Sequence, residues 1–254
     1  MTPLRARLLP AGIAIALVAF AAPAADQVET LADAQGRIQY AVYTRDAGAL
    51  RATRADLRTL VGDGNVAPLA FYYLGHVDFR LAQLALHEEE AEANGHLDDC
   101  IEHADAALER DPELAEAHAL SAACHGLQAD FSPIAGVLAS RSAASHLREA
   151  RELAPDNPRI ELLAAMELYR HAAEGDPQVA AGFERALQLF AREDGPRAGW
   201  PDWGLAEAHA YLGSVYLANG DIMRARNELE RALLIAPDYA WVLELVSSIQ
   251  TPLE

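Results

Sequence analysis

The segment from Ala206 to Tyr239 constrains the fold of this chain more than any other. It contains two amphipathic helical patterns, one marked by Leu212 and Tyr216 and the other by apolar residues spaced between 225 and 233. The turn Asn219-Gly220-Asp221 joins them. A single helical hairpin cannot bury its apolar faces alone, so it requires similar neighbours. We therefore interpret the rest of the chain as a stack of such hairpins.

The composition favours helices and excludes some partners. Aromatic residues make up 7% of the 254 residues, and no alternating run rich in Val, Ile and Thr reaches the length of a strand. We therefore predict an essentially all-α fold. The formal net charge is −18, and the basic residues form no stripe. Such a chain is expected to repel nucleic acids and anionic lipids, so we expect no nucleic-acid partner.

The first 25 residues have the features of a secretory signal peptide. Arg5 and Arg7 form a basic start, an apolar run follows from Ala11 to Ala22, and Ala22-Pro23-Ala24 matches an A-x-A cleavage site. The apolar run is shorter than the roughly 20 residues that a membrane span needs. No cysteine lies near the cleavage site. We therefore expect a mature protein without a transmembrane segment or lipid anchor, exported to the periplasm or secreted.

Further amphipathic hairpins account for the rest of the chain. Residues 26–62 contain two amphipathic segments and are interpreted as a degenerate N-terminal hairpin. The segment 238–250 is predicted to be a helix that caps the open face of the last repeat. Between them, within residues 67–250, we place four units at about 67–112, 114–155, 157–193 and 204–237.

Two of these units contain extra residues. In the unit 67–112, helix-forming residues continue without a breaker, so we predict a first helix from Ala67 to about Ala91 that ends before the Asn94-Gly95 turn. In the unit 114–155, residues 128–139 are predicted to form a loop, with the second helix beginning near Ser142. A loop rich in Gly and Pro, carrying Trp200 and Trp203, precedes the last unit. The sequence does not indicate what that loop does.

The segment 206–239 resembles a tetratricopeptide repeat (TPR). The TPR pattern reads W-x2-L-G-x2-Y, then A-x3-F, then P. Here His209 occupies the Trp position, Leu212-Gly213 and Tyr216 follow, Ala225-x3-Leu229 marks the second helix, and Pro237 ends the unit. The resemblance extends from about Pro68 to Ile249. It implies a right-handed superhelical solenoid of about five helical hairpins with a C-terminal capping helix. The chain also resembles exported bacterial TPR proteins of undefined activity.

The same resemblance implies a concave groove, lined by the first helix of each repeat, that receives a peptide or a partner helix. Groove side chains would face solvent in the free protein, although any single aromatic residue could instead fill a gap between helices. The Lys and Asn of TPR proteins that clamp a chaperone C-terminus are missing, so that activity is not implied. The groove positions carried over are Tyr72, Tyr73, His76, Phe79, Arg80, Arg159, Leu162, Met166, Tyr169, Arg170, Tyr211 and Ser214.

Cys100 and Cys124 are the only two cysteines. They would lie on neighbouring antiparallel helices in an oxidising compartment. A disulfide fits this arrangement if the α-carbons come within about 7 Å of each other. Two buried free thiols fit it as well, and the sequence leaves both possibilities open.

Residues that could carry other chemistry are present, but without a supporting pattern. Histidines and cysteines occur together at His96, Cys100 and His103, and again at His118, Cys124 and His125. The paired spacings of common metal sites, C-x2-C and H-E-x-x-H, do not occur, so we predict no metal site. No G-x-S-x-G, no Gly-rich phosphate loop and no recognisable Ser/His/Asp set occurs either. We therefore predict no catalytic residue, no cofactor and no enzyme activity.

Two functions remain. The leading hypothesis is a non-enzymatic periplasmic TPR scaffold or adaptor that binds a protein or peptide in its concave groove. The alternative is a small-molecule-binding accessory component of a solute transporter, with the groove closed into a pocket of about 300–1,000 Å³. An open groove would favour the first hypothesis and a closed pocket the second. Neither the partner nor the oligomeric state follows from the sequence.

Overall fold

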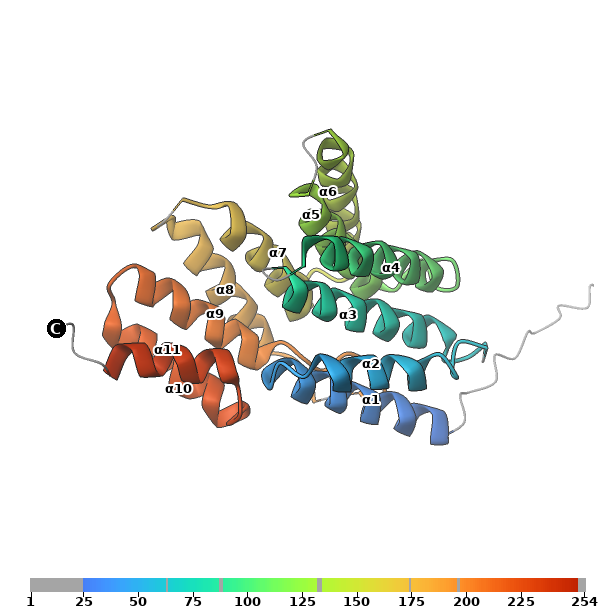
Figure 1. Ribbon diagram of the computed structural model, residues 1–254, viewed down its shortest axis with the longest axis horizontal. Helices are drawn as coiled ribbons and strands as arrows, with labels where there is room; N and C mark the ends of the chain where they lie inside the picture. Colours follow the sequence, from blue (N-terminus) through green and yellow to red (C-terminus); the bar gives the residue numbers. More distant parts are fainter. Residues whose placement is uncertain are drawn as a thin grey trace, which may run out of the picture.

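The chain folds into helices that pair in sequence order (Figure 1). The computed structural model describes residues 25–250 except 63, 87–88, 132–133, 174, 196 and the side chain of Gln250. Within that part of the chain there are eleven α-helices and no strand, as the all-α prediction required. The helices are α1 (Ala25–Tyr43), α2 (Ala47–Leu57), α3 (Ala67–Ala85), α4 (Glu90–Leu108), α5 (Ala115–Ala129), α6 (Ala135–Leu153), α7 (Pro158–His171), α8 (Pro177–Phe190), α9 (Leu205–Ala218), α10 (Ile222–Ile235) and α11 (Ala240–Gln250).

Each odd-numbered helix up to α9 packs most extensively on the helix that follows it, and α11 packs on α10. Local sequence signals set many helix starts. Asn157 accepts a hydrogen bond from the backbone N–H of Arg159, and Pro158 occupies the first turn, where its missing N–H costs nothing. Asp176 and Pro177 repeat this arrangement at the start of α8. Side-chain caps of this kind mark the starts of α2, α7, α8 and α10, whereas α3, α4, α5, α6 and α9 begin without one.

Gly213 explains the Leu-Gly signature of the last hairpin. A Cβ atom at this position would lie 2.8 Å from the side chain of Leu229 and 3.3 Å from the carbonyl oxygen of Ala225, both on α10. Contacts under 3.0 Å require a neighbour to move, so glycine lets α9 and α10 approach closely. Leu212 and Leu229 are both almost fully buried beside it. The motif thus has a packing role here.

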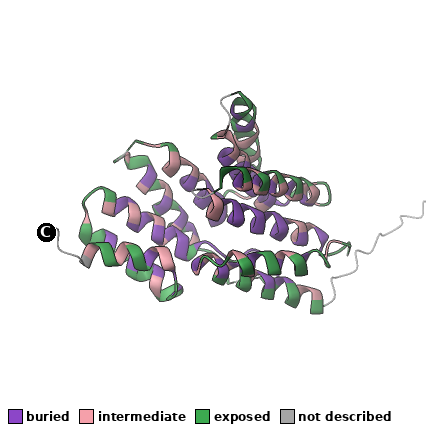
Figure 2. Cartoon of the chain, viewed as in Figure 1, coloured by how far each residue is buried: buried purple, intermediate pink, exposed green. Residues whose placement is uncertain are grey.

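The helix α3 lies at the centre of the molecule. Every residue from Tyr72 to Ala82 is buried, and Figure 2 shows the helix almost continuously in the colour of buried residues. It contacts α1, α2, α4 and α5, so partners surround it on most sides. A helix that is apolar over most of its circumference is expected only where neighbours cover it in this way.

The N-terminal hairpin does not simply extend the stack, because it also contacts the C-terminal helices. Gln35 of α1 accepts a hydrogen bond from the backbone N–H of Asp202 (3.0 Å) and donates one to its carbonyl (3.0 Å). Tyr43 donates to Glu207 of α9 at 3.1 Å. Arg45 donates to both carboxylate oxygens of Glu244 on α11, at 2.6 and 2.8 Å. Figure 1 shows the N-terminal hairpin beside the segment that leads into α9. Helices near the two ends of the described chain are therefore in direct contact.

The prediction of one helix from Ala67 to about Ala91 is wrong. The helix α3 ends at Ala85, and α4 begins at Glu90, before the residues that we interpreted as a turn. Buried residues at Ala93, Leu97 and Cys100 continue the apolar stripe of α4 on both sides of Gly95. A glycine inside a helix costs only about 1 kcal/mol, which this burial outweighs. The extra residues that the structure describes extend both helices of the hairpin, the end of α3 and the start of α4.

The prediction of a loop at 128–139 is also wrong for most of these residues. The helix α5 continues to Ala129, and α6 begins at Ala135 instead of near Ser142. Gly136, within the predicted loop, lies in the first turn of α6 against α5. A Cβ atom there would lie 2.3 Å from the carbonyl oxygen of Ala129. The glycine therefore lets the start of α6 lie close against α5, and the surplus residues 128–129 and 135–139 are helical.

Cys100 of α4 and Cys124 of α5 form a disulfide. Their α-carbons are 6.4 Å apart, and both side chains are fully buried. The bond joins the second helix of one hairpin to the first helix of the next, as the sequence allowed. It therefore crosslinks adjacent repeats across a sequence separation of 24 residues.

We expect removal of this disulfide to lower the free energy of unfolding by about 3 kcal/mol, because the crosslink restricts the unfolded chain. The measurement is urea denaturation of a Cys100→Ala/Cys124→Ala variant beside the oxidised protein. The matched control is the native sequence in excess reductant, which should resemble the variant. If the variant is as stable as the oxidised protein, the crosslink contributes no stability.

The sequence predicted a signal peptide and a mature chain without a transmembrane segment. The predicted signal peptide lies, up to residue 24, outside the described residues. Among the helices that are described, none combines the length and the apolar character needed to cross a bilayer.

Candidate binding site

The main candidate site is a hollow of about 650 Å³ bounded by the first helices of successive hairpins and by both ends of the described chain. We call it the central hollow. Its residues come from α1, α2, α3, α5, α7, α9 and α11 and from the connections next to them. They are Val42, Arg45, Ala47, Phe79, Arg80, Gln83, Leu84, Leu86, Ala123, Leu127, Leu163, Met166, Glu167, Tyr169, Arg170, Tyr211, Tyr239 and Trp241.

An aromatic cluster forms one wall of the central hollow. The ring of Tyr211 meets Tyr169 edge-on at 5.4 Å and Trp241 edge-on at 4.9 Å between centroids. Behind it, Phe183 of α8 stacks on Tyr211 at 5.3 Å. The Tyr169 hydroxyl lies 3.0 Å from the Ser214 hydroxyl, which fixes the ring of Tyr169 against α9. The wall is therefore preorganised by packing, with ring edges and faces available to an apolar ligand.

The arginines of the central hollow are already neutralised. Arg80 is 4% exposed and donates to Glu207 and to Gln83, each at 3.0 Å. Arg170 pairs with Asp130 and Glu167. Arg45 pairs with Glu244. Because every guanidinium has a carboxylate partner, the hollow offers no uncompensated positive charge to an anion. An uncharged or weakly polar ligand suits it better.

Next to the central hollow, the loop before α9 covers part of α3. Trp203 is 3% exposed, donates from Nε1 to the Tyr72 hydroxyl at 2.8 Å, and stacks on His76 with 4.6 Å between ring centroids. The Arg80 guanidinium lies 5.0 Å from the ring centroid of Trp203. Arg80 also lines the central hollow. The chain therefore covers this part of α3 with its own tryptophan.

The protonation of the buried residues follows from this packing. Burial lowers the pKa of His76 well below its usual value, and the neighbouring Arg80 lowers it further. His76 is therefore neutral at pH 7, and its Nε2 accepts a hydrogen bond from Nε of Arg80 at 3.1 Å. Burial also raises the pKa of Tyr72 and raises that of Tyr211 to about 12. The pKa values of His76, Tyr72 and Tyr211 are therefore shifted away from neutral pH.

The structure separates the predicted groove residues into two groups. Six of them line the central hollow, namely Phe79, Arg80, Met166, Tyr169, Arg170 and Tyr211. Of the other six, Tyr72, Tyr73, His76, Arg159 and Leu162 are buried, and Ser214 bonds to Tyr169.

For these five buried residues the expectation of solvent exposure is wrong. It is also wrong for Phe79, Arg80 and Met166, which border the hollow but are buried as well.

The five residues outside the hollow are covered by the chain itself. Tyr72 and His76 contact Trp203. The Tyr73 hydroxyl donates to Oε1 of Gln35 and lies 3.3 Å from the carbonyl oxygen of Gly199. Arg159 of α7 pairs with Glu193 and with Asp202 at 3.4 Å. The segment before α9 is held against these side chains, so they position the chain's own loop and cannot meet a partner directly.

Residues at the two ends of the described chain were not among the predicted site residues. Tyr239 and Trp241 belong to the segment that we interpreted only as a cap, and Val42 and Arg45 belong to the degenerate hairpin. Neither the Arg45–Glu244 pair nor the Tyr43–Tyr239 ring contact has a local sequence signal, because the partners are nearly 200 residues apart. The one sequence signal for this site was the presence of two aromatic residues, Tyr239 and Trp241, in a segment that needs only small apolar residues to cap a repeat.

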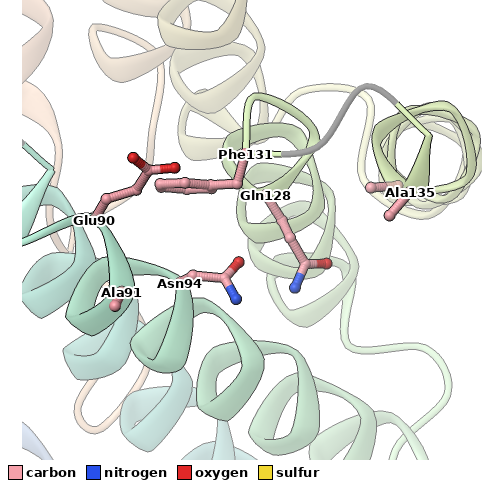
Figure 3. A pocket seen from close by; sticks show the side chains of 7 residues that line it. Glu90, Ala91, Asn94, Gln128, Phe131 and Ala135 are labelled. Atoms are coloured by element: carbon pink, nitrogen blue, oxygen red, sulfur yellow. The ribbon is translucent and has the colours of Figure 1, made fainter.

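A second hollow, of about 550 Å³, lies between the start of α4 and the ends of α5 and α6 that face it. Figure 3 shows Glu90 and Phe131 pointing toward each other, with the amides of Asn94 and Gln128 beside them. Few aromatic or buried groups converge there, and none of the predicted groove residues lines it. The central hollow is therefore the better candidate.

Comparison with known proteins supports the class of fold. A crystal structure of TTC0263, described as a thermophilic TPR protein of Thermus thermophilus, is similar with a TM-score of 0.56 and 17% sequence identity. The similarity covers 85% of this chain and 98% of that chain. The predicted TPR-like, all-α solenoid class is thereby confirmed at the level of the fold.

A crystal structure of BtubC from P. vanneervenii aligns over 91% of this chain and 96% of that one, with 18% identity and a TM-score of 0.38. No protein-family model matches the sequence, and no curated protein matches it either.

Proposed function

We propose that this protein is a non-enzymatic binding protein that takes an apolar segment of a partner protein or peptide into the central hollow. The observation that carries the proposal is the hollow itself, with its wall of Tyr169, Tyr211 and Trp241 and its neutralised arginines. Aromatic and arginine residues are the usual anchors of protein interfaces. Repeat proteins of this fold use concave surfaces in this way. Bulky apolar side chains of that segment would enter the hollow.

The proposed location is the periplasm or the exterior of the cell. It is supported by the signal-peptide pattern of residues 1–25 and by the buried disulfide, which persists in an oxidising compartment. In this reading the protein acts as an adaptor among exported proteins.

The second candidate, a small-molecule carrier, is favoured by one specific observation. The concave side is not open along its length, because Trp203 covers one part and the contacts of α1 with α9 and α11 bound another. What remains, about 650 Å³, lies within the range of small-ligand pockets. In this version an uncharged, aromatic or aliphatic ligand would occupy the same hollow, and the protein would accompany a transporter.

The test is a peptide-library selection against the native protein, followed by measurement of each enriched peptide on the variants. We expect enriched peptides to share a bulky apolar residue and to bind Tyr169→Ala and Trp241→Ala more weakly by about 1–2 kcal/mol each. The matched control is Tyr40→Ala, since Tyr40 is 60% exposed on α1 and does not line the hollow.

Enriched peptides that bind all three variants equally well would contradict the site. Native mass spectrometry of the freshly purified protein separates the two candidates. A retained small molecule that Trp241→Ala loses, together with no enriched peptide, would replace the peptide function with the carrier function.

A further inference from the structure

Three histidines form a cluster on α5 and α6, away from the central hollow. His118 and His125 lie two helical turns apart on α5, and His146 lies on α6. His118 Nδ1 is 3.0 Å from His146 Nδ1. The ring of His125 stacks on that of His146, with centroids 6.0 Å apart and planes at 23°. All three side chains are partly exposed, so an ion can reach them from solvent.

The hydrogen bonds of the cluster determine which nitrogens carry lone pairs. His118 Nε2 lies 3.2 Å from the carbonyl oxygen of Pro112. A carbonyl only accepts, so Nε2 of His118 bears the proton and its Nδ1 bears the lone pair. His146 Nδ1 must then donate the hydrogen bond between the two rings. His125 Nδ1 is buried and has no hydrogen-bond partner within the described part of the chain.

We propose that His118, His125 and His146 bind a divalent metal ion of the zinc type. Imidazole nitrogens are preferred ligands of Zn²⁺ and of neighbouring borderline metals. Two nitrogens at Zn–N distances of about 2.0–2.1 Å in a tetrahedral site lie about 3.3 Å apart, close to the separation of the two Nδ1 atoms. The ion would replace the proton between them, and His146 would carry its proton on Nε2 instead.

The surroundings of the cluster support this assignment. A metal-bound histidine usually donates its other N–H to a carbonyl or carboxylate, and His118 already does so to Pro112. His125 supplies the third ligand through the nitrogen that lacks a partner, once its ring turns toward the pair. Burial lowers the pKa of both His125 and His146, which favours the neutral imidazoles that a metal ion requires. Water would complete the coordination.

Among the described residues, the group that already brings three ligand atoms within 4.8 Å of one another is Asp78, His96 and Asp99. In the histidine cluster only His118 and His146 are that close, and His125 joins them once its ring turns. In the group of Asp78, His96 and Asp99, however, Arg54 already neutralises the two carboxylates. Nε of Arg54 lies 2.9 Å from Asp78 Oδ1, and its Nη2 lies 2.6 Å from Asp99 Oδ2. A metal ion would have to displace this guanidinium from two carboxylates. The histidine cluster contains no cation that competes in this way.

The experiment is a titration of the full chain with Zn²⁺ by isothermal calorimetry, after removal of any affinity tag and of bound metal with a chelator. We expect one equivalent to bind. The substitutions His118→Gln, His125→Gln and His146→Gln should each weaken binding about tenfold or more. The controls are Asp99→Asn, which alters the competing group, and His171→Gln, an exposed histidine of α7. Both should bind Zn²⁺ as the native chain does.

Several results would overturn the proposal. They are the absence of stoichiometric Zn²⁺ binding, an unchanged affinity in any of the three cluster variants, and loss of binding in Asp99→Asn. A second measurement on the native sequence does not depend on how the variants fold. Bound Zn²⁺ should protect His118 and His146 from modification by diethyl pyrocarbonate, read by peptide mass spectrometry, and equal modification with and without Zn²⁺ would also overturn it.

Discussion

Replacing Glu207 by alanine is expected to lower the free energy of unfolding by about 3–5 kcal/mol. Glu207 is 2% exposed and accepts hydrogen bonds from Arg80 and from the Tyr43 hydroxyl. The substitution leaves the guanidinium of Arg80, itself 4% exposed, without a carboxylate partner. An uncompensated buried charge is costly because the interior solvates it poorly. Urea denaturation followed by circular dichroism measures the effect.

Two companion variants isolate the cause. The exposed pair of Arg226 and Glu230 on α10 provides a matched control, and Glu230→Ala should change stability by no more than about 0.5 kcal/mol. The double variant Arg80→Met/Glu207→Leu, which removes both charges and keeps apolar volume, should recover a large part of the loss. If the double variant is no more stable than Glu207→Ala, the unpaired charge is not the reason for the instability.

The second large effect is expected at Tyr72. Changing Tyr72 to alanine should cost about 3–5 kcal/mol, the range for deleting a buried aromatic side chain. Its ring is 1% exposed and contacts Tyr73 and His76, and its hydroxyl accepts the hydrogen bond from Trp203. Tyr72→Phe keeps the ring but leaves the buried indole N–H unpaired, so a loss of about 1–3 kcal/mol is expected.

Thermal and urea denaturation of both variants, beside Tyr40→Ala as the exposed-tyrosine control, provide the measurement. A further consequence is release of the loop, because Trp203 loses its partner. Tryptophan fluorescence of Tyr72→Phe should therefore shift to longer wavelength as water reaches the indole. A Tyr72→Ala protein that melts like Tyr40→Ala would mean that Tyr72 is exposed in solution after all.

Much of the fold could be predicted from the sequence, because caps and apolar spacing are local. The pattern of Leu212, Tyr216 and Leu229 predicted the hairpin that became α9 and α10. One error came from Gly95, which was interpreted as a turn residue yet lies inside α4. The helix α4 is stabilised by burial of residues such as Leu97. Local sequence rules consider the helix-breaking tendency of a glycine but not this burial. The other error was the loop predicted at 128–139, where α5 continues to Ala129 and α6 begins at Ala135.

The candidate site could be predicted only in part. Tyr169, Arg170 and Tyr211 were identified because the first helices of repeats share one side of the stack. That reasoning could not foresee that Trp203 would cover Tyr72 and His76, since a loop can dock anywhere its chain reaches. The contributions of Arg45 and Trp241 depend on the meeting of distant helices, which is a tertiary property.

The contact between the N-terminal hairpin and the C-terminal helices also bears on how the protein unfolds. Open repeat arrays behave as nearly one-dimensional chains, in which end repeats fray before the middle. Here the two end hairpins are joined through Tyr43, Glu207, Arg45 and Glu244, so neither end can detach without breaking contacts with the other. Unfolding should accordingly be a single cooperative transition. Amide hydrogen exchange should then be slow both in the middle of α1 and in the buried helix α3. Early exchange throughout α1 would mean that the end contacts do not couple the repeats.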